Sequence, residues 1–114
     1  MEERIVIVAA ALAVLVLLSV VAARTFPKGA KVPMQWGITG KPTWYAPVPF
    51  AVSATPVLAA IVFTLSAALT GVTEKAQRDF DNAWPLMVGI FLFVHVVHLA
   101  CAFWHFAARR RADG

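Results

Sequence analysis

The sequence predicts an all-α membrane protein with three transmembrane helices and a first loop rich in proline, glycine and aromatic residues. The chain of 114 residues is 61% apolar and 14% charged, against about 45–50% and about 25% in an average soluble domain. Its sixteen charges (10 Lys and Arg plus 6 Asp and Glu) fall in four short segments. The three stretches between them are charge-free, and each reaches the roughly 18 residues that mark a spanning helix. Residues 1–114 therefore form one integral membrane domain.

The first predicted helix covers about residues 5–23. It is a run of Ala, Val and Leu whose many β-branched residues would favour a strand in a soluble protein. A lone strand in lipid leaves its backbone polar groups unpaired. We therefore expect a helix here.

The first loop, residues 24–49, is dense in residues that break helices. Its five prolines are Pro27, Pro33, Pro42, Pro47 and Pro49. Such a density excludes a long helix. Aromatic residues are interleaved with them, and Trp and Tyr favour the headgroup layer of a membrane. We expect the loop to lie against the membrane surface, with a short hairpin around residues 38–41.

The second predicted helix covers about residues 50–71, with Pro56 in its first turns. Small side chains recur every four residues at Ala60, Thr64 and Ala68. A stripe of small residues lets two helices approach closely in a membrane. It therefore predicts a packing face on this helix.

A short loop of mixed charge, residues 72–83, is expected to lead into the third helix. Asn82 is a suitable N-cap, and Pro85 fits the first turn, where its missing N–H is harmless. The helix is predicted over about residues 85–108. The three arginines that follow suit both a helix C-terminus and lipid phosphates.

Three crossings place the first loop and the C-terminal tail on the same side of the membrane. These two segments hold seven Lys and Arg residues (four plus three), whereas the N-terminus and the second loop hold three (one plus two). Cytoplasmic segments carry an excess of Lys and Arg. The charge count therefore predicts that the first loop faces the cytoplasm.

The third predicted helix carries metal-binding side chains within an arc of about 120°, taking 100° per residue. These side chains are His95, His98, Cys101 and His105. Imidazole binds haem iron, copper or zinc, and thiolate favours softer metals. The first two helices offer no further ligand, so a haem or metal site would need a second copy or solvent. The other interpretation is that the histidines hydrogen-bond to neighbouring helices.

The sequence holds no catalytic motif, and it predicts a protein without enzymatic activity. It lacks a Ser-His-Asp set, paired carboxylates, a Gly-rich phosphate loop and a paired-cysteine zinc pattern. Cys101 is the only cysteine, which excludes an internal disulfide. The net charge of +4 suits the headgroups of a lipid bilayer. The basic residues outside the helices are not interleaved with base-stacking groups, so the sequence does not predict binding to nucleic acid.

The first loop also carries a motif in three parts. They are Phe26-Pro27, then Val32-Pro33-Met34-Gln35-Trp36, then Gly40-Lys41-Pro42-Thr43-Trp44-Tyr45-Ala46. This resembles the motif after the first span of a bacterial membrane family that carries the domain of unknown function 1648 and includes immunity proteins against the Sdp killing factor. Gln35 and Thr43 depart from its usual His and Asp, and four residues separate Pro27 from Val32 where the family usually has two.

The resemblance implies a loop on the outer face of the membrane, opposite to the side that the charge count predicts. It also implies a multi-pass protein of the cell (plasma) membrane, of immunity or envelope-stress type. Its loop would bind a membrane-active peptide, a lipid or a partner protein. The residues expected to carry that binding are Pro33, Gln35, Trp36, Gly40, Pro42, Trp44 and Tyr45.

Two alternative functions stay open at this point. One is a haem- or metal-binding membrane protein that uses the histidines of the third helix. The other is a subunit of an oligomeric transporter or a larger membrane complex, because three helices enclose no pathway alone. That second alternative requires a homo-oligomer or a partner membrane protein.

Overall fold

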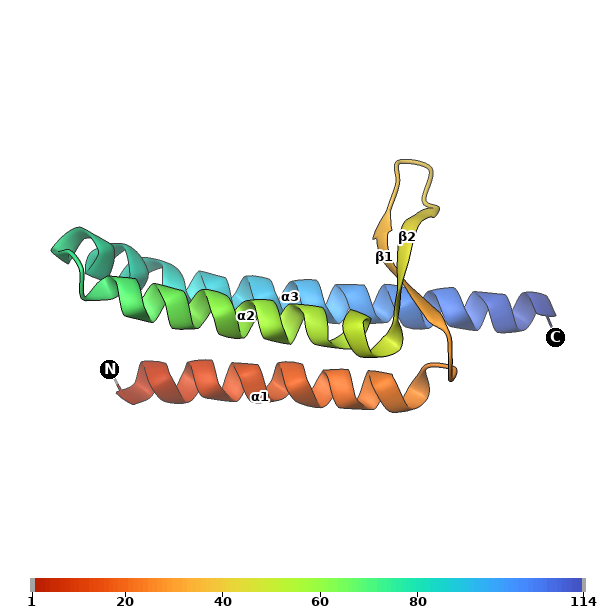
Figure 1. Ribbon diagram of the computed structural model, residues 1–114, viewed down its shortest axis with the longest axis horizontal. Coiled ribbons are helices and arrows are strands. Elements are labelled where there is room, and N and C mark those ends of the chain that lie inside the picture. Colours follow the sequence, from red (N-terminus) through yellow and green to blue (C-terminus); the bar gives the residue numbers. More distant parts are fainter. Residues whose placement is uncertain (1, 114) are drawn as a thin grey trace.

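The computed structural model describes residues 2–113 as three long helices and a hairpin. The elements are α1 (Glu2–Thr25), β1 (Lys31–Trp36), β2 (Pro42–Pro47), α2 (Val48–Thr70) and α3 (Glu74–Asp113). The helices run side by side along one axis, and the hairpin projects from their side (Figure 1). All three helices are long and apolar enough to cross a membrane. The three predicted helices are therefore confirmed as helices, but the all-α class is corrected by a two-stranded sheet in the first loop.

The predicted hairpin is confirmed, and it closes around the expected residues. β1 and β2 pair antiparallel, with Val32 opposite Ala46 and Pro33 opposite Tyr45. The Gly37 N–H donates to the Lys41 carbonyl at 2.9 Å. Gly40 has φ of 83°, a left-handed conformation that glycine adopts without steric cost. The prolines of the loop fit this short sheet because edge strands tolerate a missing N–H.

The third helix begins about ten residues earlier than the sequence indicated, so the expected loop over residues 72–83 is wrong. Thr73, not Asn82, caps the helix, because its Oγ1 accepts the Ala76 N–H at 3.0 Å. Side-chain pairs one turn apart stabilise the polar start, among them Lys75 with Asp79 at 3.1 Å. The mixed charges that indicated a loop lie on exposed faces of the first turns of α3. Pro85 lies inside the helix.

The core consists of two apolar clusters with a polar layer between them. One cluster surrounds Leu15, Ala59 and Phe63 towards the N-terminal end of α1. The other lies beside the hairpin and joins all three helices to both strands. Its buried members are Ala22, Phe26, Val32, Ala46, Ala51, Val52, Leu99, Ala102 and Phe106. The buried polar side chains Ser19 and His95 come between the two clusters along α1 and α3.

The small-residue stripe of α2 does not form the predicted packing face within this chain. Ala60, Thr64 and Ala68 are exposed, and α2 instead buries the side that carries Ala59 and Phe63. The first two stripe residues border an open groove of about 550 Å³ between α1 and α2.

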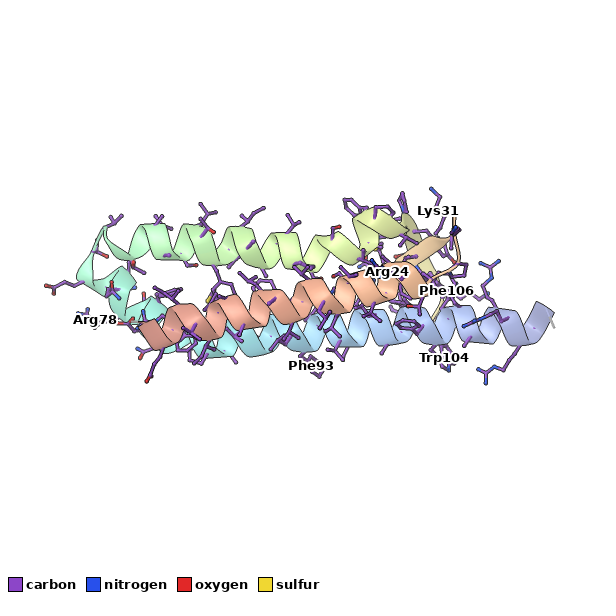
Figure 2. All side chains as sticks on the ribbon, turned by 90° about the horizontal axis from the view of Figure 1, so that it is seen from below. Arg24, Lys31, Arg78, Phe93, Trp104 and Phe106 are labelled. Atoms are coloured by element: carbon purple, nitrogen blue, oxygen red, sulfur yellow. The ribbon has the colours of Figure 1, made fainter. Side chains whose placement is uncertain are left out.

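Charged side chains gather at the two ends of the helical bundle. Arg78 lies at one end, and Arg24 and Lys31 lie near the other (Figure 2). Between the ends, apolar side chains such as Phe93 point outward from the bundle. The molecule is therefore an apolar rod, 58 Å in its longest Cα extent, with polar ends.

Candidate functional site

The loop residues predicted to bind a ligand fall into an anchored base and an exposed outer part of the hairpin. Pro33 is buried at the base. Towards the turn, Trp44 donates its indole N–H to Gln35 Oε1 at 3.3 Å, and the Thr43 hydroxyl donates to the Gln35 carbonyl at 3.2 Å. The two positions that depart from the family motif, 35 and 43, are therefore hydrogen-bonded to each other.

The exposed part of the hairpin is apolar and basic. Trp44 and Tyr45 are each 45% exposed, and Ile38 in the turn is fully exposed. Lys41 is exposed next to the turn, and Lys31 is exposed at the start of β1. This combination presents aromatic surface and positive charge at the side of the bundle.

His98 joins the hairpin to α3. Its Nε2 lies 3.0 Å from the Pro33 carbonyl oxygen. A carbonyl can only accept, so this imidazole carries its proton on Nε2 and donates it to β1. The ring of Trp36 meets the imidazole edge-on, with 6.4 Å between ring centroids. The helix face and the loop, two separate candidates in the sequence, meet here.

His105 makes a second contact with the hairpin, one that is aromatic and involves no hydrogen bond to β2. Its ring centroid lies 6.2 Å from that of Tyr45 and 5.5 Å from that of Phe106. The side chain is half-buried. His98 and His105 therefore contact opposite strands, β1 and β2.

His95 points away from the hairpin into the centre of the bundle, where it is fully buried. Its Nε2 lies 2.9 Å from Ser19 Oγ and 3.2 Å from the Leu15 carbonyl oxygen. The Ser19 hydroxyl in turn donates to the Val52 carbonyl at 2.6 Å, which is the nearer of its two acceptors, the other being the Leu15 carbonyl of its own helix at 2.9 Å. A single hydrogen-bond network thus joins all three helices, and we call Ser19, His95 and the Val52 carbonyl the helix junction.

The helix junction exists because of a proline. In a regular helix the Val52 carbonyl would accept the N–H of the residue four positions later. That residue is Pro56, which has no N–H to donate. Ser19 supplies the missing donor from the neighbouring helix, so the orphaned carbonyl of α2 is satisfied in the interior of the bundle.

The four predicted metal ligands of α3 are not assembled into one site. Within residues 2–113, no group of three or more His, Cys, Asp or Glu side chains is placed to hold a metal ion. His95 bonds to α1, His98 to β1, and His105 packs on Tyr45. Cys101 borders the same cavity as His98. The interpretation that the histidines hydrogen-bond to neighbouring helices describes His95, whereas His98 bonds to a strand of the hairpin.

Two features of this region leave little signal in the amino-acid sequence. One is the helix junction, whose only signal is a proline four residues after Val52 together with a serine in another apolar helix. The other is the contact between loop and third helix, for which sequence spacing holds no signal, because Pro33 and His98 are 65 positions apart.

Comparison with known proteins finds no match. No protein-family model fits the chain, and no curated protein or solved structure is significantly similar to it. The resemblance of the loop motif to the Sdp-immunity-like family therefore stays a prediction.

Proposed function

We propose that this chain is an integral protein of the cell membrane that crosses the bilayer three times. The support is the exposed apolar surface along the helices, where Leu17, Leu65 and Phe93 are each more than half exposed. A soluble protein rarely exposes so continuous an apolar surface. α3 has 40 residues, about 60 Å at about 1.5 Å each, so both of its ends extend beyond a hydrocarbon core of about 30 Å.

In this arrangement the hairpin lies along the membrane surface. It projects across the long axis of the bundle, near the ends where α1 finishes and α2 begins (Figure 1). If the bundle axis crosses the bilayer, a hairpin that projects from the side of the bundle runs along the surface. Its tryptophans and lysines suit the headgroup layer, where aromatic rings are half-buried and cations meet lipid phosphates.

The hairpin is the recognition element of a non-enzymatic protein of immunity type, and its ligand is a membrane-active peptide. The observation that carries this is the contrast between a base fixed to all three helices by buried residues and an exposed apolar turn at Ile38. The sheet described within residues 2–113 has two strands. Because β1 is bonded to α3 through the Pro33 carbonyl, the outer edge of β2 is the one that an extended peptide can pair with.

A survival assay tests this function. Cells that make the protein are compared with cells that lack it under a panel of cationic and killing-factor peptides. We expect at least tenfold higher survival against one peptide of the panel. The variant Ile38→Ser/Trp44→Ala should abolish the protection, because it removes the exposed apolar part of the hairpin.

The matched control is Leu69→Ser/Val72→Ala, at the opposite end of the bundle, where both side chains are similarly exposed. It should protect as well as the wild type at equal membrane levels. Equal survival with and without the protein across the whole panel would contradict the proposal. Protection that persists in the hairpin variant would move the recognition element elsewhere.

A further inference from the structure

A cavity of about 350 Å³ lies between the hairpin, α2 and α3. Three residues with soft metal-binding atoms border it: Met34 from β1, and His98 and Cys101 from α3. The remaining border is largely apolar and includes Phe93 and Val97. A thioether, an imidazole and a thiol therefore line one cavity whose remaining wall is largely apolar.

The hydrogen bond of His98 occupies one ring nitrogen, Nε2, and leaves the other, Nδ1, to bind a ligand. Because Nε2–H is committed to the Pro33 carbonyl at 3.0 Å, the lone pair of the neutral ring resides on Nδ1. Histidines that bind metals almost always donate their other N–H to a carbonyl or carboxylate, which fixes the ring and its tautomer. The hairpin thus holds His98 in the state that metal binding requires.

The other two donors are placed by the same contacts. Cys101 follows His98 by three residues, so the two side chains lie on the same face of α3, and helical side chains lean back towards the preceding turn. Met34 is the residue next to Pro33, the acceptor of the His98 hydrogen bond. One anchoring contact therefore holds the strand that carries Met34 against the helix that carries His98 and Cys101, and all three residues line the same cavity.

We propose that Met34, His98 and Cys101 form a binding site for a monovalent soft metal ion of the Cu(I) class. Thiolate and thioether ligands select Cu(I) over harder ions. Binding converts the Cys101 thiol to the thiolate and releases its proton. His95 is committed to the helix junction, and His105 does not border this cavity. The proposal does not depend on peptide recognition by the hairpin.

Metal titration of the purified full-length protein in mild detergent is the test. Ag(I) serves as a soft probe without redox chemistry, and Cu(I) is titrated against a coloured chelator, with Zn²⁺ as the harder comparison. We expect one equivalent of Ag(I) or Cu(I) to bind. Trp36 borders the cavity and contacts His98, so binding should quench tryptophan fluorescence, and Trp36→Phe should remove most of that quenching.

Met34→Leu and Cys101→Ser should each weaken the binding at least tenfold. Met34→Leu conserves volume, so the fold is retained. Met87→Leu, within the other apolar cluster, is the matched control and should bind as the wild type does. The proposal is overturned if the wild type fails to compete with the chelator. It is also overturned if Met34→Leu binds as the wild type does while Cys101→Ser abolishes binding, because a free thiol alone then accounts for it.

Discussion

His95 and His98 lie one turn apart on α3, yet their surroundings have opposite characters. His95 is fully buried between two apolar clusters and bonds to α1. His98 is half-buried, bonds to the hairpin and borders an open cavity. A histidine in an apolar helix is therefore a packing group where the bundle encloses it. It becomes a candidate ligand where one nitrogen is anchored by a hydrogen bond and the ring borders a cavity.

The largest effect is expected from His95→Ala. This change removes a fully buried side chain and the donor to Ser19, and large-to-small changes in a core cost about 3 kcal/mol. The free energy of unfolding in detergent should fall by about that amount. His105→Ala, which removes a half-buried imidazole on the same helix, should cost under about 1 kcal/mol. If both variants lowered the free energy of unfolding equally, the helix junction would stabilise the protein no more than the hairpin contact does.

His98→Ala should act locally, on the hairpin. It removes one hydrogen bond to Pro33 and the edge contact with Trp36, together worth about 1.4 kcal/mol of hairpin anchoring. Hydrogen exchange of the β1 amides should accelerate about tenfold, because 1.4 kcal/mol corresponds to a factor of ten. The amides of α1 around Ser19 should exchange at the wild-type rate. Faster exchange throughout the bundle would show that His98, like His95, holds the helices together.

The smallest effect tests whether Pro56 is the cause of the helix junction. Ser19→Ala should cost about 1 kcal/mol, within the range of hydrogen bonds between membrane helices. In a Pro56→Ala background the restored N–H can satisfy the Val52 carbonyl, so the same change should cost about half as much. A double-mutant cycle measures this coupling.

Ser53→Ala is the control for that cycle, because its hydroxyl bonds within α2 to the Pro49 carbonyl at 2.5 Å. It should cost the same in both backgrounds. If Ser19→Ala is equally costly with and without Pro56, the proline does not explain the junction.

Local patterns predicted most of the secondary structure. The charge-free stretches marked all three helices, because a long apolar run has one compatible form in lipid. The prolines and the glycine at position 40 predicted the hairpin, since they exclude a helix and permit a tight turn. The start of α3 was missed because hydropathy does not distinguish a charged loop from a charged helical face, whereas the Thr73 cap and the Lys75–Asp79 pair do.

The amino-acid pattern was sufficient to predict the number of helices, the approximate extents of α1 and α2, the hairpin and the single face of α3 that carries histidines and cysteine. The role of each histidine follows from its partners in the folded chain. Spacing along a helix fixes which side chains share a face, but the groups opposite that face come from remote segments. For His95 that group is Ser19, and for His98 it is Pro33. The partner sets the direction of each hydrogen bond, and hence which nitrogen is left for a ligand.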